Sequence, residues 1–325
     1  VGFKSLTSNT TASNNTAVGN LALCCNTTGA ENTAVGIQAL CKTTTGCRNT
    51  AVGGSALVCN TEGCQNVAMG RNSMRCNTTG DNNLGIGNTA LGANTTADDN
   101  TAVGASSLDA NTTGANNTAV GKSALGGNTT ASNNTAVGKD SMLLTTTGTC
   151  NTAVGMCSMA DNTTGDQNAA FGYFALQNNT TADYNVAIGG CAMFTNTTGG
   201  CNTALGRNAL YANSSGHSNT AVGCGALDTN TTGTVNQAFG RNALCANTTA
   251  SCNSAFGYNV LAVNTTGANN TAMGNSSLDA NTTGAANVAL GYKSLSGNTT
   301  ADSNTAVGAE ALLVNSTGDN NTAIG

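Results

Sequence analysis

Apolar and polar residues follow one another in this chain in a pattern that returns at every seventeenth position. Aliphatic residues stand at Val18, Val35 and Val52, and the same step continues without insertion or deletion to Ile324. The 325 residues hold 19 such repeats with two residues over. Because an internal repeat decides the fold class before other features do, we number the consensus NTAVG-xx-AL-xx-NTTG-xx from position 1 to position 17, with Asn15 at position 1.

Each repeat has two positions for large apolar side chains. Position 4 is Val, Ile, Leu, Met or Phe, and position 9 is Leu or Met. Position 2 is mostly Thr but also Val67 or Leu84, which is typical of a strand. Positions 2 and 4 share one face of such a strand, and we predict that positions 4 and 9 point inward. Position 3, which is Ala except at Gly85, is then predicted to face outward.

Charged residues mark the outside of the repeat. All 25 stand at positions 6, 7, 10, 11, 16 or 17, except Glu62 at position 14. Three solvated corners therefore separate the segments NTAVG, AL and NTT. A 17-residue unit is too short for a helical repeat of about 34 residues. The pattern predicts an all-β parallel β-solenoid of 19 coils, one continuous array over 1–325, with about 4.8 Å per coil and a length of roughly 90 Å.

Composition excludes several other classes. The chain has 42 Gly, no Pro or Trp, and only 8% charged residues, unlike a disordered linker. The net charge of −5 disfavours a nucleic-acid partner, and no apolar run approaches the about 20 residues of a membrane span. Val1 and Gly325 both fall inside a repeat and neither end has a polar cap, so we expect a fragment of a longer chain.

The phrase NTAVG followed by a small-apolar pair resembles the head repeats of trimeric autotransporter adhesins and related repeats of phage and viral fibre proteins. That resemblance covers the whole chain and implies a left-handed parallel β-roll with three chains side by side. A three-sided left-handed helix stays open as an alternative, because V-G-x-x-A-L also resembles the hexapeptide of that fold.

Asparagine is invariant at position 1 and frequent at position 12. Stacked amides can form a hydrogen-bonded ladder, and Asn tolerates turn conformations. Position 12 also forms sequons, which leaves glycosylation open, although glycans about 4.8 Å apart would collide. The candidate sites are Asn9, Asn26, Asn77, Asn94, Asn111, Asn128, Asn162, Asn179, Asn196, Asn213, Asn230, Asn247, Asn264, Asn281, Asn298 and Asn315.

Fourteen cysteines are many for such a chain, and six of them form pairs one repeat apart. Stacked Cα atoms at about 4.8 Å lie within disulfide range. This spacing predicts disulfides and an oxidising, extracellular compartment, with the pairs Cys24–Cys41, Cys47–Cys64 and Cys59–Cys76. Bonds between chains stay open for the other eight, which are Cys25, Cys150, Cys157, Cys191, Cys201, Cys224, Cys245 and Cys252.

No constellation in the sequence indicates an enzyme or a bound cofactor. The single histidine, His217, and the adjacent pair Asp98 and Asp99 occupy corner positions and are interpreted as surface residues. No phosphate-binding G-x-x-x-x-G-K-[ST] motif occurs. A calcium β-roll needs an Asp in every repeat, whereas position 16 is Asp only at Asp81, Asp98, Asp166, Asp183, Asp302 and Asp319.

The function that the pattern favours is an extracellular structural fibre or stalk on a cell or virion surface, with adhesion to a host-surface or matrix receptor as an added role. We expect lateral homo-oligomerisation through the NTAVG face, as a trimer, with the position 3 alanines at the interface. The alternative is an ice-binding or other surface-binding solenoid. Adjacent Thr at positions 13 and 14 point to opposite faces, and residues such as Gln237 interrupt the Thr column at position 2.

Overall fold

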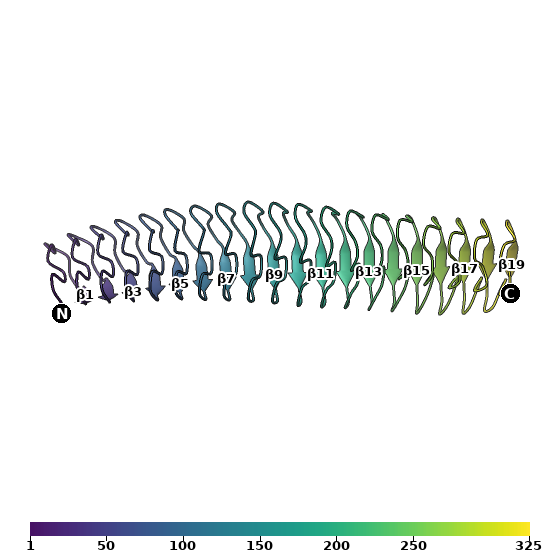
Figure 1. The fold of residues 1–325 in the computed structure, drawn as a ribbon, viewed down its shortest axis with the longest axis horizontal. Coiled ribbons are helices and arrows are strands. Elements are labelled where there is room, and N and C mark those ends of the chain that lie inside the picture. The colour runs from purple at the N-terminus through teal and green to yellow at the C-terminus, as the bar shows by residue number, and fades with distance from the viewer. The chain divides into compact units, whose positions relative to one another are not determined.

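The computed structural model describes all 325 residues and contains 19 parallel strands, one in each repeat from β1 onward (Figure 1). No helix is present. The predicted all-β parallel β-solenoid is thereby confirmed, while its left-handed sense stays a prediction. The chain divides into two compact units, Val1–Thr164 and Gly165–Gly325, which are described separately.

Every strand covers positions 2 to 4 of its repeat. The first unit contains β1 (Thr16–Val18), β2 (Thr33–Val35), β3 (Thr50–Val52), β4 (Val67–Met69), β5 (Leu84–Ile86), β6 (Thr101–Val103), β7 (Thr118–Val120), β8 (Thr135–Val137) and β9 (Thr152–Val154). The second contains β10 (Ala169–Phe171), β11 (Val186–Ile188), β12 (Thr203–Leu205), β13 (Thr220–Val222), β14 (Gln237–Phe239), β15 (Ser254–Phe256), β16 (Thr271–Met273), β17 (Val288–Leu290), β18 (Thr305–Val307) and β19 (Thr322–Ile324).

Within each unit every strand pairs with the next one in perfect register, so that equivalent residues stack. Thr118 pairs with Thr135 in the first unit, and Thr203 pairs with Thr220 in the second. The AL and NTT segments form turns rather than strands. Their backbones still bond from coil to coil, as in the 2.9 Å bond from the N–H of Leu23 to the carbonyl of Ala39. The ladder of hydrogen bonds therefore extends well beyond the three-residue strands.

Left-handed backbone conformations close each coil within a single repeat. Positions 7, 9 and 17 have positive φ, for example 56° at Ser123, 50° at Leu125 and 59° at Asn116. Position 5 has φ near +135°, and a Cβ added at Gly121 would collide with the carbonyl of Gly138. Glycine is therefore the only residue that fits position 5. Leucine is unusual in this region, and its complete burial at position 9 offsets the conformational cost.

Position 3, not position 4, points into the core. Ala119 and Leu125 are fully buried, whereas Val120 at position 4 is 37% exposed. The predictions that position 9 faces inward and that positions 2 and 4 share a face are confirmed, but the prediction that position 4 faces inward is wrong. The expected interface through position 3 is wrong too, because these alanines lie inside their own chain.

The narrowness of the coil explains why position 3 is always small. A Cβ added at Gly85 would lie 2.7 Å from Ser73 Oγ and 2.9 Å from Met74 Cγ. Position 3 thus packs directly against positions 8 and 9 of the opposite wall, and a larger side chain has no room there.

Candidate functional site

The position 12 asparagines form a buried ladder of side-chain amides. Asn77 Nδ2 donates to Asn60 Oδ1 at 2.9 Å and to the carbonyl of Gly80 at 3.0 Å. Asn94 continues the ladder with a 2.8 Å bond to Asn77 Oδ1. All three asparagines are fully buried. The predicted amide ladder is confirmed at this position.

The position 1 asparagines are equally buried but bond mainly to the backbone. Asn117 Oδ1 accepts the backbone N–H of Asn134 at 3.0 Å, and Asn117 Nδ2 donates to the carbonyl of Ala131 at 2.9 Å. The same carbonyl also accepts from Asn128 Nδ2 at 3.1 Å. Two asparagine columns thus meet at the position 15 carbonyl and fasten the turn to the strand.

This burial bears on the candidate glycosylation sites. Among the sequon asparagines, only Asn9 and Asn315, in the terminal coils, are partly exposed, and all the others are fully buried. A glycan replaces one amide hydrogen of Nδ2, the atom that donates to the ladder, and needs open space around it. Glycosylation is therefore incompatible with the folded coil at every buried sequon.

The position 16 aspartates cap backbone groups. Asp98 Oδ1 accepts the N–H of Asp81 at 2.7 Å, and Asp183 Oδ1 accepts the N–H of Asp166 at 2.7 Å. His217, at the same repeat position, is exposed, with its Nδ1 3.3 Å from Ser218 Oγ. The corner placement predicted for these residues is confirmed.

The structure brings the sulfurs of two predicted cysteine pairs together. Cys24 Sγ lies 3.0 Å from Cys41 Sγ, and Cys47 Sγ lies 2.8 Å from Cys64 Sγ. All the cysteines are free thiols in this structure. The disulfides Cys24–Cys41 and Cys47–Cys64 therefore stay predictions, and the short distances between their sulfurs support them.

The third predicted pair is arranged differently. Cys59 and Cys76 stand one coil apart, but the neighbour of Cys59 Sγ is Lys42 Nζ at 3.9 Å. The Cys59–Cys76 disulfide also stays a prediction, with less support from the geometry than the other two.

Burial raises the pKa of several thiols, including those of the closely spaced cysteines. Burial and the hydrogen bond with Cys47 raise the pKa of the Cys64 thiol to about 11. Burial likewise raises the pKa of the Cys24 and Cys25 thiols. These groups are protonated near neutral pH, so their chemistry depends on a partner that displaces the proton.

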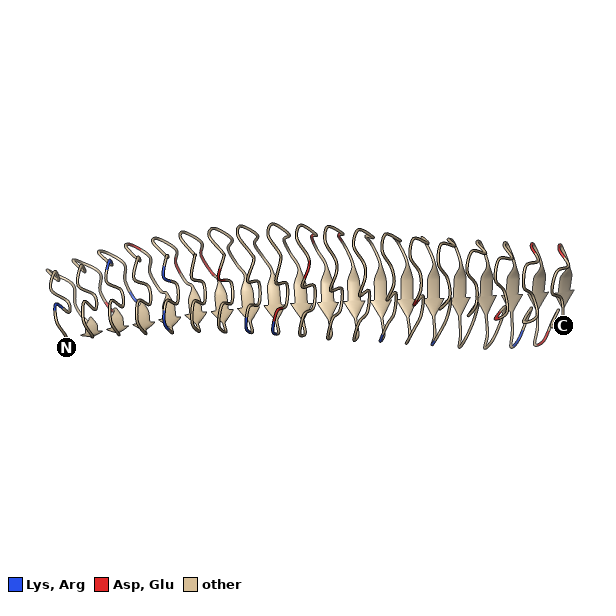
Figure 2. Ribbon diagram, viewed as in Figure 1, with Lys and Arg blue, Asp and Glu red and all other residues tan.

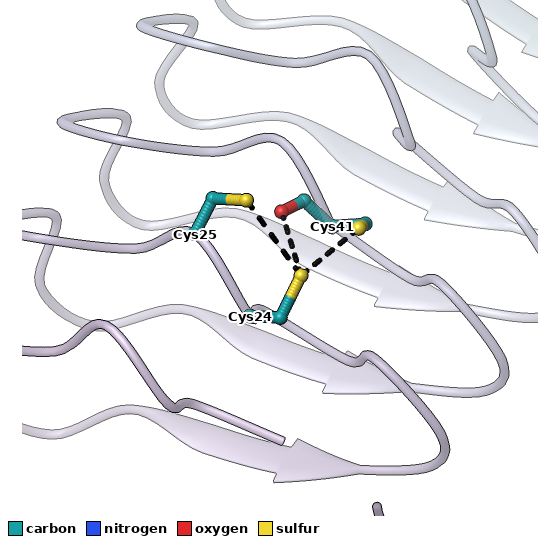
Figure 3. A group of neighbouring side chains, drawn as sticks. All are labelled: Cys24, Cys25 and Cys41. Carbon is teal, nitrogen blue, oxygen red and sulfur yellow. Dashed lines mark hydrogen bonds between the residues drawn. The ribbon is translucent and has the colours of Figure 1, made fainter. Parts of the chain in front are cut away.

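Cys25 joins one of these pairs, which the sequence analysis missed. Its Sγ lies 3.7 Å from Cys24 Sγ, so that three thiols from two successive coils converge (Figure 3). The sequence feature that could have indicated this three-thiol cluster is that Cys24 and Cys25 are adjacent and that Cys41 occupies the position of Cys24 in the next repeat.

The outer face of the strands was also missed as a candidate surface. Position 4 side chains are exposed in both units, for example Ile86 at 36% and Leu205 at 45%. No strand contains a charged residue, and the charges lie on the connecting turns (Figure 2). Each unit therefore presents an uncharged outer face. Position 2 is mostly Thr in the first unit and Thr, Val, Ala, Ser or Gln in the second, beside an apolar residue at position 4.

A hollow of about 340 Å³ lies in the first unit where Gly92 and Ala93 leave space between larger neighbours. Arg75 and Asp109 line it, and burial raises the pKa of the Asp109 carboxyl. The hollow is open to solvent, and Cys76 and Thr89 also line it.

Comparison with known proteins adds no relative: no protein-family model matches the chain, and no curated protein matches it. The structure contains no helix long and apolar enough to cross a membrane.

Proposed function

We propose that this chain is an extracellular structural fibre or stalk protein that associates laterally with copies of itself through the outer face of its strands. The observation that carries the proposal is the uncharged apolar column at position 4. Contiguous exposed apolar patches are rare on monomers and mark interaction sites. A second copy of the chain has the same coil spacing, so its column matches this one side chain by side chain.

The hydrogen bonding supports a mechanical role. Within each unit the coils bond to one another through strands, turns and two asparagine columns, and the same bonds recur in most coils. Such a stack resists local opening because each coil lies between two neighbours. Proteolytic resistance and rigidity follow from this arrangement.

The proposal that the chain is extracellular is based on its cysteines. Two pairs of sulfurs lie 3.0 Å and 2.8 Å apart, and disulfides persist in oxidising compartments. The trimeric state and the adhesive role rest on the resemblance to adhesin and fibre repeats, and a host-surface or matrix receptor would bind along the exposed face.

The test of self-association introduces charge on the outer face. Val120→Glu together with Val137→Glu places two carboxylates in the position 4 column, where neither side chain is buried in its own chain. We expect the parent to be oligomeric, a trimer by light scattering, and the double variant to be monomeric because paired apolar columns cannot accommodate unpaired charges.

The matched control places the same charges elsewhere on the same two coils. Thr130→Glu with Thr147→Glu changes exposed residues at position 14, where Glu62 already stands, and should leave the oligomer intact. A monomeric parent, or equal dissociation of both double variants, would refute association through this face. Antibody labelling of intact cells or virions, compared with permeabilised ones, tests the extracellular location.

Ice binding is the second candidate, and one observation favours it. Because positions 2 and 4 both face outward, β6 to β9 present a flat Thr-x-Val array rather than the split Thr columns of positions 13 and 14. Thermal hysteresis of the parent at low concentration, lost in Val120→Glu/Val137→Glu, would favour this function over the fibre. Its absence in the parent removes the candidate.

A further inference from the structure

Three cysteine sulfurs form a compact cluster at one corner of the first unit. Cys24 Sγ is central, 3.0 Å from Cys41 Sγ and 3.7 Å from Cys25 Sγ, and all three sulfurs lie within 4.8 Å of one another (Figure 3). Cys24 and Cys25 come from the turn after β1, and Cys41 comes from the equivalent turn one coil later. The stacking of coils therefore builds a group that no single repeat contains.

The spacing of the sulfurs suits a metal ion. A metal–thiolate bond of about 2.3 Å places three sulfurs around a planar three-coordinate ion about 4 Å apart. Two of the separations, 3.0 Å and 3.7 Å, are shorter than this value, and the third is within 4.8 Å. Small rotations about the Cα–Cβ bonds would bring the sulfurs to it without movement of the hydrogen-bonded backbone.

The ligand set selects the ion. The cluster contains three thiols and no histidine or carboxylate. A structural zinc site takes four protein ligands, whereas soft thiolates alone favour Cu(I). We propose that Cys24, Cys25 and Cys41 form a trigonal tris-thiolate site for Cu(I). This inference concerns one corner of a single chain and applies to the protein in its reduced state, before the predicted Cys24–Cys41 disulfide forms.

Binding exchanges three protons for the ion. Three neutral thiols and one Cu(I) give a tris-thiolate complex of charge −2 and three protons, so charge and atoms balance. Because three protons leave, the affinity should rise with pH.

Oxidation competes with the metal for the same sulfurs. A small-molecule disulfide RSSR would convert the thiols of Cys24 and Cys41 into a disulfide and release two RSH. Only Cys25 would then remain as a ligand. The site is therefore available in the reduced protein and closed when the predicted Cys24–Cys41 disulfide forms.

The test uses the full chain, reduced and kept under anaerobic conditions, in competition with bicinchoninate for Cu(I). Cys47→Ser and Cys64→Ser form the background, since this second thiol pair at 2.8 Å could hold Cu(I) between two sulfurs. We expect one tightly held Cu(I) per chain, with X-ray absorption showing three sulfur neighbours. Cys25→Ser in this background should leave two sulfurs and weaken binding at least tenfold.

Serine already occupies the cluster's repeat positions in other coils, at Ser296 and Ser8, so the substitutions suit the fold. The matched control is Cys150→Ser, an exposed thiol outside the cluster, which should change neither affinity nor coordination. Two sulfur neighbours in the background protein, unchanged binding in Cys25→Ser, or failure to compete with bicinchoninate would each overturn the proposal.

Discussion

Thr43 and Thr145 stand at position 12, where the other repeats have asparagine. Both hydroxyls are buried without a hydrogen-bond partner. The Oδ1 atoms of Asn26 and Asn128, one coil earlier, also lack a partner, because threonine has no amide to donate to them. The amide ladder is thus interrupted twice in the first unit, and each interruption leaves buried polar atoms unsatisfied.

Closing these two gaps should stabilise the protein. Thr43→Asn and Thr145→Asn each supply an amide that can donate to the waiting Oδ1 atom and an oxygen that can accept from the next coil. We expect a gain of about 1 kcal/mol per position in the free energy of unfolding, measured as a higher urea midpoint.

The reverse change serves as the control for the ladder. Asn111→Thr removes an amide that bonds to Asn94 Oδ1 at 3.0 Å and to the carbonyl of Gly114 at 2.9 Å. It should cost about 1–3 kcal/mol, because the neighbouring groups stay buried. Equal midpoints for all three variants would show that the ladder contributes nothing to stability.

At the scale of the element, each strand has only three residues, and every strand from β2 to β18 buries only the middle one. In β7 the order is Thr118, Ala119, Val120, with the alanine fully buried and the valine exposed. The coil gains its core from position 9 and from packed small residues rather than from the large side chain of its strand. The large side chain stays available for contacts outside the coil.

This arrangement predicts a sharp contrast between neighbouring residues of one strand. Ala119→Glu should destabilise the first unit by several kcal/mol, because the carboxylate has neither room nor a partner. Thr118→Glu on the same strand should cost less than about 1 kcal/mol, since its side chain faces outward. Urea unfolding followed by circular dichroism compares them, and similar midpoints would contradict the assigned faces.

The sequence predicted the length of the coil, the parallel strands, the buried position 9 and the asparagine ladder, because each depends on a strict period. It did not predict which face of NTAVG is buried. The two-residue period of a strand assigns Thr118 and Val120 to the same face, but it does not say whether that face points to the core or to solvent. Hydrophobicity alone favoured valine as the buried residue. The deciding factor is the close opposite wall, visible at Gly85 and Met74, which only the three-dimensional structure reveals.

Periodicity also predicted only part of the candidate cysteine site. Stacked pairs such as Cys47 and Cys64 follow from the period, and the structure places their sulfurs together. The third ligand, Cys25, lies at a neighbouring position of the coil, so its contact depends on side-chain direction at a turn. The sequence also did not predict that the sequon asparagines are buried. A polar Asn-Thr-Thr segment is typical of an exposed turn, and only the structure shows that its asparagine amides donate hydrogen bonds inside the coil.

At the scale of the whole molecule, the repeated register predicts which changes of length the chain tolerates. Deleting residues 100–116 removes one complete repeat, so that Leu84 of β5 meets Thr118 of β7 with equivalent positions still opposed. We expect the circular dichroism spectrum per residue to be unchanged and the urea midpoint to correspond to a change below about 1 kcal/mol.

Deleting 100–115 is the matched control, one residue shorter. It shifts the join by one position, which turns inward side chains outward at that point. We expect a loss of several kcal/mol and protease cleavage near the join. If the two deletions behave alike, the register between coils is not what holds the stack together.

The in-register stacking also has a consequence for the gene. Neighbouring repeats such as those beginning at Asn100 and Asn117 share their NTAVG and NTT segments, and tandem copies with such shared segments can misalign during replication and recombination. An exchange between misaligned copies adds or removes a whole repeat, which leaves both the reading frame and the strand register intact. Alleles of this gene should therefore differ in length by whole multiples of seventeen codons. Each such allele encodes a protein that still folds, so selection can change the length of the molecule one repeat at a time.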